Sequence, residues 1–204
     1  MPKRVDRQAR REAIAEAVLR IASREGIAAV SIGKVAAEAA ISKGLVQHYF
    51  ASKESMLLFA TSFLRARVEA RVRRQREALE NPTPRTILRT ILLSFLPVDE
   101  ERRAEALIAS TSFVRAITEP ALADRFRTGH MIVLAMIAEQ IAAARDEGSV
   151  PQTARPAEEA TLLLALLRGV TAHMLFDYQT IEEATATLDL ALDRLFGGDS
   201  DASP

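Results

Sequence analysis

A cation, an amide, an imidazole and a phenol are gathered in one short segment of this 204-residue chain, at Lys43, Gln47, His48 and Tyr49. Lysine attracts phosphate oxygens, and the amide of glutamine can pair with the edge of a base in the DNA major groove. Gly44, near the start of the segment, would let the backbone come close to a phosphate, which helix N-terminal N–H groups favour. The spacing therefore indicates contact with nucleic acid.

Two short helices joined by a tight turn are expected to position these side chains. Ser31 and Ser42 are good N-cap residues, because a serine hydroxyl accepts a hydrogen bond from an otherwise unpaired backbone N–H. Apolar residues that would staple each helix start, or bury one side of it, follow the same pattern: Val30, Val35, Ala36, Ile41, Leu45, Val46 and Phe50. Ser52 is expected to cap a longer helix that ends in the basic run 65–76.

The joint pattern resembles the helix-turn-helix of the TetR family of transcriptional regulators. The residues that carry the resemblance lie in the first quarter of the chain: Val35, Ala36, Ala39, Ile41, Ser42, Lys43, Gly44, His48, Tyr49, Phe50, Ser52 and Lys53. The length of the chain and its helical remainder also fit this family.

The resemblance implies a role for individual residues. Ser31, Tyr49 and Lys53 match positions that contact backbone phosphates, and Lys43 and Gln47 match positions of the recognition helix that read bases. Many members have tyrosine at the position of Gln47, and glutamine can pair with adenine, so a different operator preference is expected. The predicted DNA-contacting residues are Ser31, Ser42, Lys43, Gly44, Gln47, His48, Tyr49 and Lys53. Simple capping explains the serines equally well, and Tyr49 and His48 could instead have packing or solvent-exposed roles.

Charge is distributed unevenly along a chain whose formal net charge is zero. Residues 1–76 hold 16 Lys and Arg against 7 Asp and Glu, and residues 77–204 hold 11 against 20. Such asymmetry favours a polyanion as the partner of the N-terminal part, although solvated helix faces of opposite sign are the alternative. The basic N-terminal residues form either a flexible solvated end or an arm that attracts phosphate: Lys3, Arg4, Arg7, Arg10 and Arg11.

Apolar periodicity predicts an all-α fold of about nine helices, with no alternating strand pattern. The first helix is expected over 5–25, ending at a left-handed Gly26, and helices beyond the basic run are expected over 85–96, 100–117, 120–147, 156–178 and 181–196. We divide the chain into a helix-turn-helix domain over 1–53, a ligand-binding and dimerisation domain over 54–197, and a disordered tail over 198–204.

No catalytic or metal-binding pattern is present. The chain lacks cysteine, and its three histidines are widely separated. Phosphate-binding glycine loops and nucleophile motifs are also missing. We therefore expect a protein that is not an enzyme and needs no cofactor or metal. The longest apolar stretch, over 162–176, is too short to cross a bilayer, which predicts a cytoplasmic protein without a membrane partner.

The last two helices, over about 156–196, carry apolar residues on more than one side. This indicates packing on a partner as well as on the same chain, and the resemblance implies a homodimer through this pair, with a monomer as the alternative. It also implies a ligand cavity, for which the candidate residues are Phe95, Phe113, His130, Met131, Met136, His173 and Phe176. Ordinary core packing is the competing explanation for each, and His173 is expected to be a buried histidine with a hydrogen-bond partner.

The sequence thus predicts a ligand-responsive, sequence-specific DNA-binding regulator, most simply a repressor that binds a pseudo-palindromic operator as a homodimer. Alternatives are a nonspecific DNA-binding protein, or a helical small-molecule binding protein without DNA activity. The C-terminal region is similar to the branch of the family that includes choline-sensing repressors. Choline would require an aromatic cage, and the chain offers no tryptophan and two tyrosines, Tyr49 and Tyr178.

Overall fold

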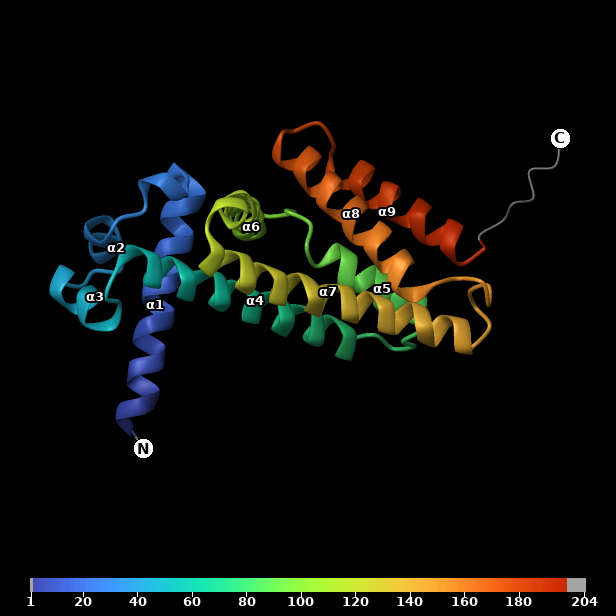
Figure 1. Ribbon diagram of the computed structural model, residues 1–204, viewed down its shortest axis with the longest axis horizontal. Helices are drawn as coiled ribbons and strands as arrows, with labels where there is room; N and C mark the ends of the chain where they lie inside the picture. The colour runs from blue at the N-terminus through green and yellow to red at the C-terminus, as the bar shows by residue number, and fades with distance from the viewer. Residues whose placement is uncertain (1, 198–204) are drawn as a thin grey trace. The chain divides into compact units, whose positions relative to one another are not determined.

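The computed structural model describes residues 2–197, and the side chains of residues 7–197 apart from 121, 122 and 125. Within this part the chain forms nine α-helices and one 3₁₀ turn and no strand, which confirms the all-α prediction (Figure 1). The elements are α1 (Pro2–Glu25), η1 (Ile27–Ala29), α2 (Ile32–Glu38), α3 (Lys43–Tyr49), α4 (Lys53–Glu77), α5 (Pro84–Leu93), α6 (Glu100–Thr118), α7 (Pro120–Asp146), α8 (Pro156–Leu175) and α9 (Ile181–Leu195).

The helices group into two compact units, each built from separate stretches of chain. The first unit takes in the chain up to Arg67 together with Asp99–Phe126. The second takes in Val68–Val98 together with the chain from Arg127 onward. The long helices α4 and α7 contribute to both units. The domain boundary expected after residue 53 stays a prediction, and the expected tail over 198–204 lies outside the described residues.

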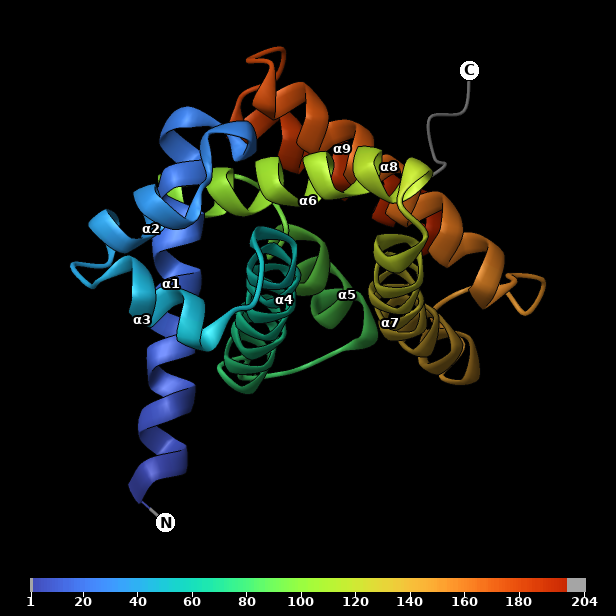
Figure 2. The same ribbon diagram turned by 60° about the vertical axis from the view of Figure 1, so that its left-hand side comes forward.

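The first unit is organised around the apolar stripe of α1. Ile14, Val18 and Ile21 are buried, and α1 packs on both α2 and α6 (Figure 2). Gly26 ends α1 with a φ of 81° and a ψ of 161°. These backbone angles are essentially restricted to glycine, and they differ from the left-handed helical conformation that the sequence predicts. The chain continues from Gly26 directly into η1.

Ion pairs fasten α2 to α1. The carboxylate of Glu38 accepts hydrogen bonds from Arg20 Nε at 2.7 Å and from Arg24 Nη2 at 2.5 Å. The bond to Arg24, with that to Arg20, lowers the pKa of Glu38 to about 2. Lys34 of α2 pairs in the same way with Glu25 of α1. These contacts hold α2 against α1 and engage three cations, Arg20, Arg24 and Lys34.

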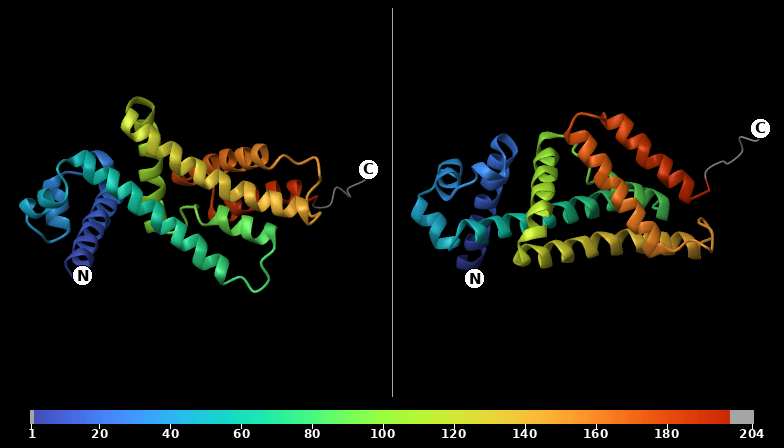
Figure 3. Two further views of the ribbon diagram at one scale, coloured as in Figure 1. Left: turned by 60° about the horizontal axis from the view of Figure 1, so that its bottom comes forward. Right: turned by 45° about the horizontal axis from the view of Figure 1, so that its top comes forward.

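The second unit has its own core, formed by apolar side chains of α5, α7, α8 and α9 with the end of α4. Helix α9 packs on both α8 and α5 (Figure 3). Two arginines one turn apart on α5 pair with two aspartates one turn apart on α9. Arg89 donates two hydrogen bonds, of 2.6 and 2.9 Å, to the carboxylate of Asp189, and Arg85 pairs with Asp193. The two pairs set the antiparallel register of these helices.

Two helices end three residues earlier than the sequence predicts. The helix expected over 85–96 stops at Leu93, and the helix expected over 156–178 stops at Leu175. In the second case Asp177 has a φ of 58°, so the chain leaves the helix before Tyr178 and reaches the Thr180 cap of α9. None of the helices in the described part combines the length and the apolar character needed to cross a bilayer.

Candidate nucleic-acid interface

Helix α3 exposes its polar side because its apolar side is anchored in the first unit. Val46 is fully buried and Phe50, which closes the helix, is 2 % exposed. Lys43, Gln47 and His48 are exposed on the remaining surface. Helix α3 lies against α2 (Figures 1 and 2). The arrangement is that of two short helices joined by a tight turn, as the sequence predicts.

Six of the eight predicted contact residues are exposed, and Tyr49 and Lys53 are partly buried. The Tyr49 and His48 rings meet edge to face, with centroids 5.2 Å apart. The structure therefore gathers all eight positions on or beside α2, α3 and the start of α4. Their contact with DNA stays a prediction.

The predicted caps at Ser31 and Ser42 are confirmed. The Lys34 N–H donates to Ser31 Oγ at 3.2 Å, and the Leu45 N–H donates to Ser42 Oγ at 3.1 Å. Each hydroxyl accepts in its capping bond, so its own O–H remains able to donate to a phosphate oxygen. Capping and phosphate contact are thus compatible at both serines.

Lys43 and Lys53 differ from three other cations of this region, Arg20, Arg24 and Lys34. Arg20, Arg24 and Lys34 are engaged with carboxylates, whereas neither Lys43 nor Lys53 has an ion pair with any residue that the structure describes. An ammonium without an ion pair is able to attract a phosphate or a base edge. The two lysines that the sequence singled out are therefore without an ion pair among the described residues.

Ser52 anchors the start of α4 next to Lys53. The Ser55 N–H donates to Ser52 Oγ at 3.2 Å, and the Ser52 N–H donates to Ser55 Oγ at 3.1 Å. Hydrogen bonds from its own N–H and from the Ser52 hydroxyl lower the pKa of Glu54. This reciprocal cap confirms the role predicted for Ser52 and fixes the backbone from which Lys53 projects.

Arg11 is a structural residue of this region that the sequence did not reveal. Its guanidinium carbon lies 4.1 Å from the centroid of the Phe59 ring and 5.1 Å from that of Phe50. The two rings themselves meet at 5.4 Å. Expecting Arg11 to belong to a flexible end or arm was wrong, because these rings hold it. The side chains of Lys3 and Arg4 lie outside the described residues.

The seven residues predicted to line a ligand cavity belong to both units. Phe113 belongs to the first unit, is 45 % exposed and packs on Phe126. The other six belong to the second unit. There Phe95 and Met136 pack against the apolar core, whereas Met131 is exposed.

His130 already has a partner within the second unit. Arg168 Nη2 donates to His130 Nδ1 at 2.7 Å, so the imidazole accepts in its neutral form. Partial burial, and then the charge of Arg168, lower the pKa of His130. Burial also lowers the pKa of Arg168.

His173 is exposed, so the expectation of a buried histidine was wrong. Its neighbours Val170 and Met174 face the core of the second unit, which turns His173 to the outside. There its ring meets Tyr178 edge to face at 6.0 Å, and Phe176 stacks on Tyr178 at 5.7 Å. Phe176 is 68 % exposed, so these two predicted ligand residues lie in a surface aromatic cluster.

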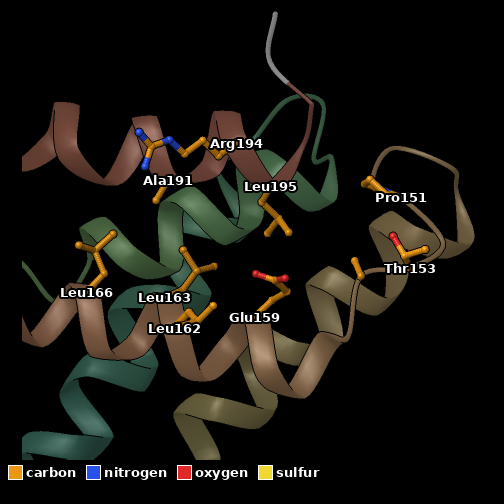
Figure 4. Close-up of a pocket in the computed structure, with 10 residues that line it drawn as sticks. Pro151, Thr153, Glu159, Leu162, Leu163, Leu166, Ala191, Arg194 and Leu195 are labelled. Atoms are coloured by element: carbon orange, nitrogen blue, oxygen red, sulfur yellow. The ribbon is translucent and has the colours of Figure 1, made fainter. Parts of the chain in front are cut away.

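An open hollow of about 470 Å³ lies elsewhere in the second unit, between α8, α9 and the loop before α8. Glu159, Leu162 and Leu163 of α8 face Leu195 of α9 across it (Figure 4). None of the seven predicted ligand residues lines this hollow. Among the residues whose side chains are described, no group of acidic residues and histidines could hold a metal ion.

Comparison with known proteins assigns two segments of the chain to described families. Residues 14–59 match the family described as bacterial regulatory proteins, tetR family. Residues 84–197 match the family described as BetI-type transcriptional repressor, C-terminal. The HTH-type transcriptional regulator PksA of Bacillus subtilis is 30% identical over 179 residues, which cover 87% of this chain and 84% of PksA. The HTH-type transcriptional regulator BetI of Pseudomonas fluorescens is 30% identical over 92 residues, 45% of this chain and 47% of BetI.

Solved structures of transcriptional regulators have a similar fold. A transcriptional regulator from Rhodococcus sp. Rha1 superposes with a TM-score of 0.79 and 27% identity, over 95% of this chain and 99% of that one. A transcriptional regulator from Saccharomonospora viridis, solved in complex with choline, has a TM-score of 0.77 at 22% identity, over 94% and 97% of the two chains. With two matching segments and a relative that spans most of its length, this chain belongs to the TetR family of transcriptional regulators, which are ligand-responsive DNA-binding repressors.

Proposed function

We propose that the chain recognises its operator by placing α3 in the major groove, with Lys43 and Gln47 on base edges. Ser31, Tyr49 and Lys53 would contact backbone phosphates on either side. The observation that carries this proposal is the orientation of α3: Val46 and Phe50 are buried, while Lys43 and Gln47 are exposed. Ser42, Gly44 and His48 belong to the same surface and complete the proposed interface.

The proposed binding unit is a homodimer formed through α8 and α9. Both helices present apolar side chains to solvent although their other sides are buried: Leu162 is 64% exposed and Leu190 is 51% exposed. Exposed apolar surface of this kind marks interaction sites. Two-fold symmetry would present two copies of α3 to successive half-sites, which is the reason to expect a pseudo-palindromic operator.

A small-molecule effector would control the spacing of the two recognition helices. Coupling between effector and operator is usually worth about 1–3 kcal/mol, or roughly 5–150-fold in operator affinity. Choline is bound by one neighbour of similar fold, yet a quaternary ammonium calls for an aromatic cage, and the aromatic rings around Tyr178 lie on the surface. The predicted cavity residues and the cytoplasmic location stay predictions.

Selection from a random duplex pool, followed by fluorescence anisotropy across salt concentrations, tests the proposal. We expect an inverted repeat that binds about 10³-fold or more tightly than a scrambled duplex. Equal and steeply salt-dependent affinity for both duplexes would instead indicate a nonspecific DNA-binding protein. No binding at low salt would favour a small-molecule binding protein without DNA activity.

A further inference from the structure

The side chain of Lys43 lies across a glycine of the neighbouring helix. Gly33 is the second residue of α2, and a Cβ built on it would lie 3.0 Å from Lys43 Cε and 3.5 Å from Lys43 Nζ. Carbon atoms prefer to stay about 3.5–4.0 Å apart, so a Cβ at position 33 would require the end of the Lys43 side chain to move by a few tenths of an ångström. The contact joins the start of α2 to the start of α3.

Nothing else in the described residues holds the Lys43 ammonium. It has no ion pair, and the lysine that follows Gly33 on α2, Lys34, is bound to Glu25. A lysine on a flexible four-carbon stem adopts many rotamers unless packing selects among them. The bare backbone at Gly33 is the surface that the stem rests on.

Gly33 is not required by the conformation of its own helix. Its φ is not positive, unlike that of Gly26, and it lies within the hydrogen-bonded α2. Alanine is more favourable than glycine inside a helix. Helix formation therefore gives no reason for glycine at this position, whereas the approach of Lys43 does.

We propose that the missing side chain at Gly33 sets the position from which Lys43 reaches a base, so that Gly33 is a specificity-determining residue. This inference rests on the proposed base-reading role of α3. Any side chain at position 33 pushes the Lys43 ammonium outward by a few tenths of an ångström or into another rotamer. Gly33 itself touches no base: it is a positioning residue that acts through Lys43.

The test compares Gly33→Ala, Lys43→Ala and the double variant with the wild-type protein, using anisotropy on the selected operator and on a scrambled duplex. We expect Gly33→Ala to lower the ratio of the two affinities by roughly fivefold, the lower end of what one good base contact provides. In the Lys43→Ala background the same substitution should leave the ratio unchanged. Thermal unfolding of Gly33→Ala should occur at the wild-type temperature or above.

Ala37→Gly is the matched control, because Ala37 is exposed on α2 and the exchange changes helix propensity without approaching Lys43. An unchanged ratio for Gly33→Ala, or an equal loss with and without Lys43, would overturn the inference while leaving operator binding intact. A wild-type protein with no operator preference would instead overturn the proposed function, and the positioning role with it.

Discussion

The guanidinium carbon of Arg11 lies 4.1 Å above the centre of the Phe59 ring, which ties the middle of α1 to α4. Arg11 also covers Phe50, the residue that closes α3. The Nε of Arg11 is buried without a hydrogen-bond partner in the described residues. Attraction between the guanidinium and the faces of the two phenylalanine rings compensates for this missing hydrogen bond. One side chain thus connects α1, the end of α3 and α4 within the first unit.

Replacement of Arg11 by methionine should destabilise the protein. Methionine retains an apolar stem but loses the cation–π attraction, which predicts a loss of about 0.5–2 kcal/mol in the free energy of unfolding. Urea denaturation followed by circular dichroism measures it. Arg7→Met is the control, since Arg7 is exposed on the same helix. Surface substitutions usually change stability by less than about 0.5 kcal/mol. Equal effects of the two variants would remove the role assigned to Arg11.

The Glu38 carboxylate should make the stability of the helix-turn-helix depend on acid pH. Its hydrogen bonds to Arg24 and Arg20 lower its pKa from 4.5 to about 2 in the folded protein. Because the folded-state pKa is the lower one, the stabilisation is fully present above the unfolded-state pKa and is lost as the pH falls towards 2. Glu38→Gln should be less stable than the wild type at neutral pH, and the difference should shrink below pH 4.5.

Urea midpoints at neutral pH and at several acid values measure that difference. Glu16→Gln is the control, because Glu16 is exposed on α1 and forms no ion pair with the described residues. If the gap between Glu38→Gln and the wild type stays constant down to pH 2 or so, the ion pairs contribute nothing to folding.

Local signals in the sequence identified the framework of the interface. A cap needs one serine and a backbone N–H three residues later, so Ser31, Ser42 and Ser52 could be read from the chain. The stripe of α1 likewise follows from spacing, and Val18 and Ile21 are buried as expected. Such features depend on residues that are close in sequence.

Contacts between helices could not be predicted from the spacing of residues in the sequence. Arg11 meets two rings from distant segments, and Glu38 meets two arginines of α1, so each contact depends on how the helices pack. His173 was misplaced for a related reason: an apolar stretch does not reveal which side of its helix faces the core. The approach of Lys43 to Gly33 depends on the angle between α2 and α3, which no spacing rule supplies.

Substitutions of Gln47 and Lys53 should distinguish a contact with a base from attraction to a phosphate. Gln47→Ala should lose about 1–3 kcal/mol on the operator and little on a scrambled duplex, because the amide pairs with a base edge. Lys53→Ala should weaken both duplexes alike and reduce the slope of log affinity against log salt by about one. Anisotropy titrations on both duplexes measure the two variants side by side. Equal losses on operator and scrambled DNA for Gln47→Ala would refute its base-reading role.

Gly169 provides a test of the dimer that does not disturb the folded chain. It is exposed on α8, and a Cβ added there meets no atom within 4 Å, so a side chain can leave this position toward solvent in the single chain. If α8 packs on the α8 of a second copy, Gly169→Arg places two long cations in a close contact between helices. We expect the dimer to dissociate at micromolar concentration while the helical content stays that of the wild type.

Sedimentation velocity over a range of concentrations measures the effect of Gly169→Arg. Ala135→Lys is the matched control, because Ala135 is exposed on α7 and outside the proposed contact. A dimer that survives Gly169→Arg but dissociates with Ala135→Lys would move the interface to α7.

Loss of the dimer with Gly169→Arg should also reduce operator affinity to that of a half-site, since one copy of α3 can then reach only one major groove. Retention of full operator affinity by a monomeric variant would contradict the proposed pseudo-palindromic mode of binding.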